Sequence, residues 1–479
     1  NLSYIVNWSE QARKFYATNK TSNLLAEEFW YKEGITYSAI TSRGTGFRYL
    51  PKGCIFDKGG PSINLFINKD EVLALLNSNV AKYYFWVFNP SINLQIKDVK
   101  SFPIILPELE EIKKLAKENI DCCKMDWDSY ETSWDYKIHP LVKNTLSKDL
   151  SEKFVEWEME CDNRIKTLIR NETELNKIFI NAYGLRNEVT PDVEERDITV
   201  HKADLQRDIR SLISYAVGCM FGRYSIYQEG LMYAGGMWDY SKYKDAAWRT
   251  EGRPDVSDFY TKLHYMPDFD NIIPITDEEY FTDDIVGLFE DFIKTVYGKD
   301  TLEKNLNFVA EALGNKGNTS REVIRNYFLN NFFKDHCNTY SVTGSGKRPI
   351  YWLFDSGKQN GFKALIYMHR YDADTVGRVR TDYLHKAQKY VENAMQSAQY
   401  TIDNAKSASE KSKATKAVTK YTKQLAEMKI YDEAIAHVAN QRIEIDLDDG
   451  VKVNYAKFQG VEVAQEGKKT LKVDLLAKI

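Results

Sequence analysis

The sequence predicts a multidomain α+β protein, because three kinds of pattern follow one another along the chain. Near the amino end, apolar and polar residues alternate over short stretches between glycine-rich turns, which is typical of a mixed α/β domain. The middle of the chain carries long stretches with helical spacing. Towards the carboxyl end, a small sheet is expected together with a long helical hairpin. A chain of 479 residues is too long for one core, and two to four domains are expected.

Composition indicates a folded protein that does not enter membranes. Hydrophobic residues make up 43% of the chain and only 11 residues are proline. No apolar run approaches the 18 residues that a membrane span needs. The six cysteines form no CxxC pair, so we expect reduced thiols in a cytoplasm and no zinc site. The chain opens at Asn1 without a signal segment, and trimming from a larger protein is the simplest expectation.

Charge is unevenly distributed along the chain, whose net charge is −4. Residues 1–107, the first basic island, hold 12 Lys/Arg against 8 Asp/Glu. Residues 340–390, the second basic island, hold 9 against 4, which leaves the remainder acidic at −13. Such islands suit a polyanion groove on an otherwise repulsive surface. Ordinary charge fluctuation is the alternative.

The predicted domain at residues 1–107 combines short strands with a helix. Alternation predicts strands at 36–40 and 54–56, and again over 92–99. Between them, apolar residues from Val72 to Tyr83 predict one compact helix. Asp70 is the preferred N-cap, with Asn68 as the alternative.

Two further domains are predicted to be mainly helical. Residues 108–200 form a helical spacer, with an acidic, aromatic loop at 126–135 and a long helix from about Leu146 to Tyr183 that Gly184 ends. Residues 201–345 contain a helix at 204–224 and acidic helices around 283–297.

The last predicted domain, residues 346–479, joins a small sheet to a helical hairpin. Strands are expected at 350–354 and 364–368. The pattern from Tyr383 to Ile443 predicts an antiparallel hairpin with a polar break at 406–413. After Asp446 the chain is expected to return to short loops and strand. Such a hairpin usually serves as a packing scaffold. Its lysine-rich tip makes a role as a DNA clamp the alternative.

The motifs of several enzyme classes are missing. There is no GxxxxGK[ST] loop, no GxSxG elbow and no HExxH pair, which excludes the common nucleotide, hydrolase and zinc-protease signatures. The glycine-rich cofactor turn and the polar-Pro-Pro-aromatic loop of a DNA methyltransferase are also absent, since Asn89-Pro90 is followed by Ser91-Ile92. We therefore expect no catalytic residue, no metal and no bound cofactor in this chain.

Two acidic runs allow a metal interpretation beside a structural one. Asp126, Asp128, Glu131 and Asp135 could hold a nuclease metal, but a loop that caps and packs is the simpler interpretation. The run that begins at Asp446 resembles the start of a calcium loop, but it has no later glutamate, and a turn is favoured.

Three stretches resemble one protein family. The first consists of WYKEGITYS (30–38), RYLPKGCIFD (48–57), LLNS (75–78) and NPSINLQ (89–95), and it resembles the target-recognition domain of adenine methyltransferases. The second is DWDSYETSWD (126–135) with LNK (175–177) and YGL (183–185). The third is RPIYWLF (348–354) with GF (361–362), Tyr367, HR (369–370), RVRTDYL (378–384) and DDGVKVNY (448–455). Together they resemble the carboxy-terminal region of the PglX family, the adenine-specific DNA methyltransferases of BREX phage-defence systems.

The resemblance implies a specificity module of a larger enzyme. Family members carry the S-adenosylmethionine-binding catalytic domain upstream, so this chain would position double-stranded DNA while that domain methylates adenine N6. The flipped target base must be held while the rest of the site is bound. A protein-interaction platform that docks other BREX subunits is the alternative function. An acidic phage inhibitor that mimics DNA would be a further partner.

The two basic islands supply the candidate DNA contacts. In the first island, cations lie among glycines, which would let their loops approach phosphates closely. Asn93, Gln95 and Lys97 recur at period two, which would place them on one strand face as base readers. Satisfying turn backbone is the alternative for Asn93 and Gln95. In the second, backbone contacts are favoured over a solvated face. The candidates are Arg43, Arg48, Lys52, Lys58, Asn93, Gln95, Lys97, Lys347, Arg348, Lys358, Lys363, Arg370, Arg378 and Arg380.

Overall fold

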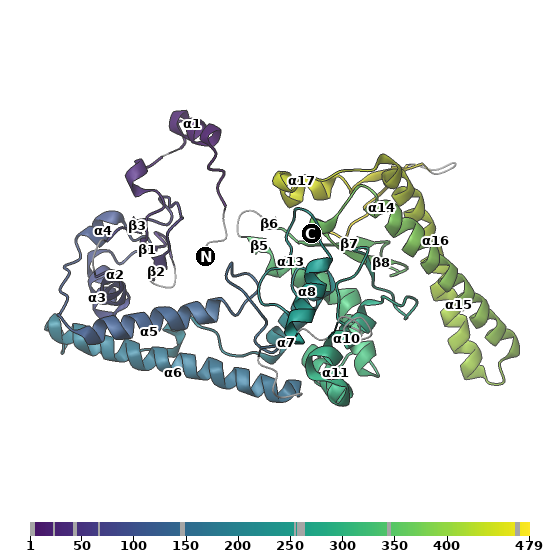
Figure 1. The fold of residues 1–479 in the computed structure, drawn as a ribbon, viewed down its shortest axis with the longest axis horizontal. Coiled ribbons are helices and arrows are strands. Elements are labelled where there is room, and N and C mark those ends of the chain that lie inside the picture. Colours follow the sequence, from purple (N-terminus) through teal and green to yellow (C-terminus); the bar gives the residue numbers. More distant parts are fainter. Residues whose placement is uncertain are drawn as a thin grey trace. The chain divides into compact units, whose positions relative to one another are not determined.

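The computed structural model describes residues 5–22, 24–41, 46–65, 68–143, 149–252, 255, 264–342, 346–464 and 470–479. The chain divides into two compact units (Figure 1). Unit 1 comprises residues 1–127 and 158–203, and unit 2 comprises residues 128–157 and 204–479. Both units combine helices with small antiparallel sheets, so the predicted multidomain α+β class is confirmed. No helix in the described part of the chain is long and apolar enough to cross a membrane.

Unit 1 is a three-stranded sheet packed on helices. The strand order is β2-β1-β3, and both pairings are antiparallel. Ile35, Tyr37 and Phe47 enter the core, where they meet the apolar faces of the helices that follow. The elements are α1 (Glu10–Thr18), β1 (Gly34–Tyr37), β2 (Phe47–Leu50), β3 (Ser62–Ile63), α2 (Lys69–Asn77), α3 (Asn79–Phe88), α4 (Ile96–Lys100), α5 (Glu110–Trp127) and most of α6 (Leu150–Ala182).

The core of unit 1 extends across the boundary predicted at residue 107. Ile112 of α5 and Phe179 of α6 are both fully buried in the same apolar cluster as the sheet. The Tyr183 hydroxyl adds a polar link, because it donates to the Pro103 carbonyl at 2.5 Å and accepts from the Ile105 N–H at 2.9 Å. The helices of the predicted spacer therefore complete the core of the domain before them.

Unit 2 surrounds the predicted strand pair with helices. Strands β7 (Tyr351–Asp355) and β8 (Lys363–Tyr367) pair in antiparallel register, and β4 (Ile273–Pro274) adds to β8. The other elements are α7 (Leu205–Met220), α8 (Ser241–Thr250), α10 (Ile285–Tyr297), α11 (Leu302–Leu313), α12 (Ser320–Tyr327), α13 (Phe333–Thr339), β5 (Ser341–Val342), β6 (Gly346–Lys347), α14 (Thr375–Arg378), α15 (His385–Asn404), α16 (Ala408–Gln441), α17 (Gly450–Ala456), β9 (Val461–Val463) and β10 (Leu471–Val473).

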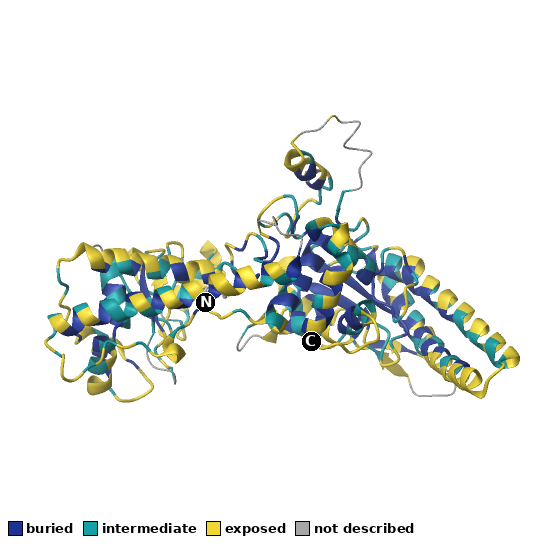
Figure 2. Ribbon diagram, turned by 90° about the horizontal axis from the view of Figure 1, so that it is seen from below, coloured by how far each residue is buried: buried dark blue, intermediate teal, exposed yellow. Residues whose placement is uncertain are grey.

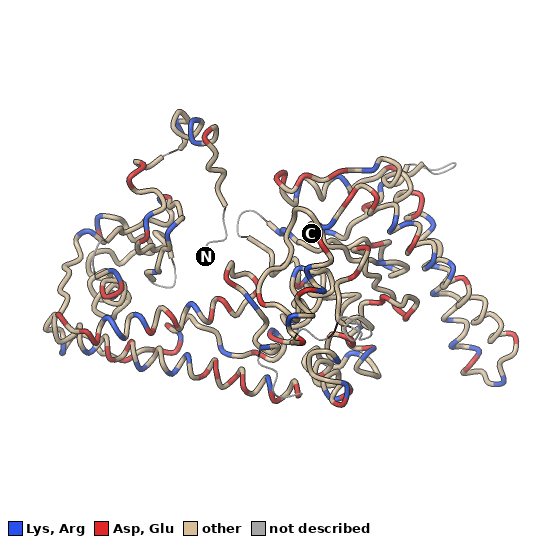
Figure 3. The backbone as a smooth tube through the Cα atoms, viewed as in Figure 1, with Lys and Arg blue, Asp and Glu red and all other residues tan. Residues whose placement is uncertain are grey.

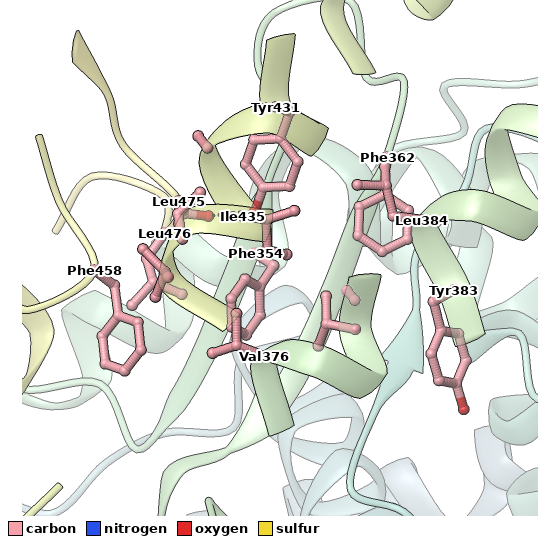
Figure 4. Close-up of a cluster of buried hydrophobic side chains, with 14 of the residues drawn as sticks. Phe354, Phe362, Val376, Tyr383, Leu384, Tyr431, Ile435, Phe458, Leu475 and Leu476 are labelled. Carbon is pink, nitrogen blue, oxygen red and sulfur yellow. Dashed lines mark hydrogen bonds between the residues drawn. The ribbon is translucent and has the colours of Figure 1, made fainter. Parts of the chain in front are cut away.

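A helical hairpin, α15 and α16, is anchored on this sheet. Tyr431 and Ile435 of α16 pack beside Phe354 of β7 in a large apolar cluster (Figure 4). The Tyr431 hydroxyl also donates to the Leu475 carbonyl at 2.6 Å. In Figure 2 the outer faces of the two helices are exposed along their length. The structure confirms the predicted hairpin but limits its break to residues 405–407, because Ser407 caps α16 by accepting from the Glu410 N–H.

Several local predictions were wrong. The helix expected from Val72 to Tyr83 is two helices, because Ser78 has an extended backbone and its hydroxyl caps α3 by accepting from the Ala81 N–H. Asn68, rather than Asp70, precedes α2. Residues 54–56 form no strand, and the segment after Asp446 contains the short helix α17 before its strands. The ends of the long helix α6 and the strands β7 and β8 agree with prediction within a few residues.

Candidate nucleic-acid interface

The sheet of unit 1 aligns polar side chains on the face opposite its core. Arg48 of β2 lies opposite Thr36 of β1, and Thr36 lies opposite Ser62 of β3. Cross-strand partners share a face, so the three form one row. Arg48 is exposed and the other two are half-buried. Sequence patterning identified Arg48 but missed Thr36 and Ser62, because strand register depends on pairing between segments far apart in the chain.

Residue 39 joins two loops that carry predicted contacts. The Ala39 N–H donates to the Gly59 carbonyl at 3.0 Å, and the Leu94 N–H donates to the Ala39 carbonyl at 2.8 Å. Lys58 directly precedes Gly59, and Asn93 directly precedes Leu94. The two residues therefore lie next to the two hydrogen bonds that Ala39 makes. A further bond, from the Thr41 N–H to the Ile92 carbonyl at 3.0 Å, fixes the second loop. Two stretches about 35 residues apart are thereby brought together beside β1.

The expected strand face of Asn93, Gln95 and Lys97 does not form. Asn93 makes a single β-bridge with Ile40, Gln95 precedes α4, and Lys97 lies within α4. The helix forms because the Asp98 carboxylate accepts the Gln95 N–H at 2.9 Å, which satisfies a donor at the helix start. All three side chains are nevertheless exposed. They share a surface loop and a helix start in place of a strand.

The turn before Asn93 is held by other side chains. The Asn89 amide donates to the Asn93 carbonyl and to the Asp98 carboxylate, both at 2.8 Å. The Ser91 hydroxyl accepts from the Asn93 N–H at 3.3 Å. Asn89 and Ser91 therefore satisfy this turn, while the Asn93 side chain lies exposed beside it.

The glycine-rich loop at 57–60 is less open to phosphate than its composition suggests. The Asp57 carboxylate accepts from the N–H groups of both Gly59 and Gly60 at 2.9 Å. Those two donors are thus already engaged by an anionic group. Lys52 and Lys58 are both exposed. The contribution to anion binding therefore rests on the lysine side chains.

Two carboxyl groups of unit 1 have shifted pKa values, one lowered by a neighbouring lysine and one raised by burial. Glu33 accepts hydrogen bonds from Lys69 and from the Tyr49 hydroxyl, and the bond from Lys69 is the main cause of the lowered pKa of Glu33. Burial raises the pKa of Glu172 on α6 to about 7, against the opposing fields of Lys82 and Arg48. The positive charge of Arg48 therefore lowers the pKa of a carboxyl group of its own unit, although burial outweighs it. Arg43, the remaining candidate of the first island, lies outside the described residues.

Arg370 of the second island is built into an aromatic cluster. Its guanidinium lies 3.7 Å from the ring centre of Trp238 and donates to the carbonyls of Phe221 at 3.2 Å and Phe269 at 3.0 Å. Burial lowers the pKa of Arg370, and the nearby Asp268 opposes this effect. All of these groups belong to unit 2, where Arg370 ties three segments together.

Arg378 and Arg380 are both paired with carboxylates. Arg378 donates to Asp372 at 2.9 Å, and Arg380 donates to Asp432 of α16 through Nε at 2.7 Å and through Nη2 at 3.2 Å. The two arginines lie around a π-helical turn at residues 379–384 rather than on a strand. A phosphate would have to compete with these carboxylates, and DNA contact by either arginine stays a prediction.

The remaining candidates of the second island differ in exposure. Arg348 and Lys358 are exposed, and Lys347 of β6 is half-buried. Lys363 is buried and pairs with Asp355 at 2.7 Å across the β7–β8 hairpin. Only part of the second basic island therefore presents charge to solvent.

The acidic side chains of the loop at 126–135 make hydrogen bonds to different parts of the chain. The Asp126 carboxylate accepts from the His201 backbone N–H at 3.1 Å and lies 2.8 Å from its ring Nδ1. Within unit 2, Glu131 is buried and accepts from the hydroxyls of Ser214 at 2.7 Å and Tyr340 at 2.8 Å. Among the described residues, no three His, Cys, Asp or Glu side chains gather as metal ligands would. These contacts support the capping and packing interpretation of the loop.

Comparison with known proteins identifies relatives over nearly the whole chain. No protein-family model matches. The adenine-specific methyltransferase PglX of Lacticaseibacillus casei (strain Zhang) is 38% identical over 476 residues, which is 96% of this chain and 37% of that protein. The adenine-specific methyltransferase BrxX of Escherichia coli O9:H4 (strain HS) is 33% identical over 488 residues, which is 96% of this chain and 38% of that protein. The resemblance to PglX is therefore confirmed, and the chain is related to a region that makes up somewhat more than a third of these adenine-specific methyltransferases.

Proposed function

We propose that this chain is the DNA-recognition portion of a site-specific adenine-N6 methyltransferase of a BREX-type defence system. Its task would be to bind and orient duplex DNA, while an S-adenosylmethionine-dependent domain outside this chain transfers the methyl group. The relatives that match 96% of the chain carry the methyltransferase name, and the chain spans less than two-fifths of their length. The sequence of this chain contains neither the glycine-rich cofactor turn nor the polar-Pro-Pro-aromatic loop of a DNA methyltransferase, which favours a binding role.

The observation that carries the proposal is the surface around Ala39 in unit 1. Here two loops are fixed to one segment by backbone hydrogen bonds, and they present Lys58 and Asn93 on either side of it. Rigid backbone attachment suits base recognition, because a bidentate amide contact depends on position and is worth about 1–3 kcal/mol of discrimination. The exposed cations Arg48, Lys52 and Lys97 would supply phosphate contacts in the same unit.

The test is sequence preference in a variant that lacks the two amides. The full chain would be used to select binding sites from randomised duplexes, and fluorescence anisotropy would give affinities for the preferred site and for an unrelated duplex. The variant Asn93→Ala/Gln95→Ala should bind the preferred site at least about 30-fold more weakly, because roughly 1–3 kcal/mol for each amide amounts to roughly 2–6 kcal/mol and about 1.4 kcal/mol is tenfold in affinity. It should bind the unrelated duplex nearly as before.

A matched control removes two amides from elsewhere in unit 1. Gln11 of α1 and Asn187, which follows α6, are both exposed, so Gln11→Ala/Asn187→Ala makes the same chemical change outside the two loops joined at Ala39. The control should keep full preference. Unchanged preference in Asn93→Ala/Gln95→Ala would remove these residues as base readers, and absence of duplex binding by the unaltered chain at low salt would reject the proposed function.

Docking of other defence subunits is the second candidate function. The observation that favours it lies in unit 2, where Met237 is 90% exposed and Phe269 is 83% exposed. Where exposed apolar side chains form a contiguous patch, they often mark a protein-interaction site. Retention of partner subunits by the full chain, abolished in Met237→Ser/Phe269→Ser but kept in an exposed Lys242→Ser control, would support it. An acidic protein that mimics DNA would instead compete with duplex for the basic surface.

A further inference from the structure

The largest group of unpaired cations in the described part of unit 2 lies outside both basic islands, near the turn of the α15–α16 hairpin. Residues 400–423 contain six lysines against Asp403 and Glu410, a local charge of +4. Five of the six have no carboxylate within ion-pairing distance among the described residues, and all are exposed. The exception is Lys420, which pairs with Asp277 at 2.5 Å. The five are Lys406, Lys411, Lys413, Lys416 and Lys423.

The spacing of these lysines along α16 places most of them on one side of the helix. The free Lys413, Lys416 and Lys423, together with Lys420, which is paired with Asp277, follow one another at intervals of three, four and three, which is the repeat of one helix face. At 1.5 Å per residue the row is about 15 Å long. One strand of B-form DNA presents about four phosphates over such a length, because its phosphates recur about every 3.4 Å along the axis.

The hairpin holds this row away from the sheet on which it is anchored. In Figure 1 the two helices extend from the β7–β8 sheet, and in Figure 3 positive residues recur along them to the turn. The anchor lies at the other end, where Met428, Tyr431 and Ile435 of α16 are fully buried or nearly so. Near the turn, only Ala414 is buried between residues 408 and 420. The lysines there are therefore not required for packing.

The side chains around the lysines suit phosphate better than a protein surface. The turn and the start of α16 carry alanine, serine and threonine, and Tyr400 is the large apolar side chain most exposed there, at 70%. Protein interfaces bury aromatic and aliphatic anchors at their centre and are poor in lysine. A polyanion needs no such anchor, because release of counterions from the phosphates drives its binding.

We propose that the turn-proximal half of the α15–α16 hairpin binds the phosphate backbone of duplex DNA. The proposal rests on the proposed function and extends it, because it adds a sequence-independent contact surface to the base-reading surface of unit 1. Lysine ammonium groups contact phosphates as point charges and do not distinguish bases. The hairpin would therefore contribute affinity to every duplex alike.

The test neutralises four of the free lysines in the full chain. Lys406→Gln/Lys411→Gln/Lys413→Gln/Lys416→Gln removes charge while keeping good helix formers on α16. Duplex binding would be measured by fluorescence anisotropy between about 50 and 200 mM salt. The slope of log affinity against log salt should fall by about 0.9 for each phosphate that is no longer neutralised, so by up to roughly 3–4. Affinity should fall by a similar factor for preferred and unrelated duplexes.

A control with the same change in net charge separates local contact from general repulsion. Lys242, Lys299, Lys316 and Lys334 are exposed positions of unit 2 outside the hairpin. The variant Lys242→Gln/Lys299→Gln/Lys316→Gln/Lys334→Gln should keep the salt slope of the unaltered chain. Circular dichroism and thermal melting should be unchanged in both variants, because none of the eight side chains is buried.

The outcomes distinguish this inference from the proposed function. A reduced slope in the hairpin variant alone supports the inference. If the unaltered chain binds duplex, the inference is overturned in two cases: the hairpin variant has the salt slope of the unaltered chain, or its slope falls only as much as that of the control variant. In both cases the proposed function still stands. Binding of acidic protein but not duplex by the hairpin lysines would also overturn it. An unaltered chain that binds no duplex rejects both.

Discussion

The two basic islands look equivalent in the sequence but differ in the structure. In the first island, Lys52, Lys58 and Lys97 are exposed. In the second, Arg370, Arg378 and Arg380 are engaged by carbonyls, an aromatic ring and carboxylates of unit 2. A count of charges along the chain cannot separate these cases, because the compensating groups come from distant positions such as Asp432.

The difference teaches that available charge, rather than local net charge, identifies a polyanion surface. An arginine with a planar fork of donors is suited to tying segments together, whereas a flexible lysine in solvent is suited to a phosphate. The second island is rich in arginines that perform the first task. A group of five free lysines of the same unit lies on the hairpin, in a part of the sequence that also contains Asp403 and Glu410 and so has a smaller net charge than its lysine count indicates.

The largest expected effect follows from removal of Arg370. Arg370→Ala would leave the carbonyls of Phe221 and Phe269 without their donor and would expose the face of Trp238. We expect the free energy of unfolding to fall by about 3 kcal/mol, because the cost of unsatisfied acceptors adds to that of the missing cation–π interaction. Urea denaturation would measure it. The exposed Lys358→Ala serves as the control and should change stability by less than about 0.5 kcal/mol.

A smaller effect is expected at the ion pair between Arg380 and Asp432. Arg380→Ala should lower the free energy of unfolding by about 1–2 kcal/mol, because it removes a two-point charge-assisted pair at a partly exposed position. Arg380→Lys should recover only part of this stability, since lysine cannot make the two-point contact. If Arg380→Ala left stability unchanged and weakened duplex binding, Arg380 would be a DNA contact, and the two islands would not differ in the way described.

The carboxyl group that faces Arg370 makes stability depend on pH. Burial, followed by repulsion from Asp270, raises the pKa of Asp268 to about 7 from an ordinary value of 3.8. The folded state therefore holds this proton more tightly than the unfolded state, so the carboxyl disfavours folding increasingly as pH rises from about 4 to about 7. Asp268→Asn, which preserves the shape, should remove this dependence.

The measurement is the change in unfolding free energy between pH 5 and pH 8. In the variant, this change should shrink by about 2–3 kcal/mol relative to the unaltered chain, from about 1.4 kcal/mol for each of the roughly two pKa units that separate the two states over this pH range. An exposed carboxylate, such as that replaced in Asp448→Asn, provides the control and should leave the pH dependence as it is. An identical pH profile for Asp268→Asn would mean that Arg370 already neutralises the group, which would sharpen the view of the second island as internally compensated.

Secondary structure could be predicted from the sequence where its cause is local. The long helix that ends at Gly184, the strands β7 and β8 and the hairpin follow from periodicity and from residues that end helices. The short segments could not be predicted in this way. Asn93, Gln95 and Lys97 alternate like a strand, but the Asp98 carboxylate and the bridge to Ile40 override that pattern. The row of Arg48, Thr36 and Ser62 depends on register, which sequence spacing does not contain.

The smallest effect on stability, and the most direct test of the contrast, is expected from the lysines of the first island. Lys52→Gln/Lys58→Gln should change the free energy of unfolding by less than about 0.5 kcal/mol, because both side chains are exposed. The same variant should lower the salt slope of duplex binding by about 2, from roughly 0.9 for each phosphate that is no longer neutralised. Arg370→Ala should show the reverse, with lower stability and an unchanged salt slope in the fraction that remains folded. A stable Lys52→Gln/Lys58→Gln variant with an unaltered slope would mean that exposure alone does not mark the phosphate contacts, and that the first island serves only to keep the surface solvated.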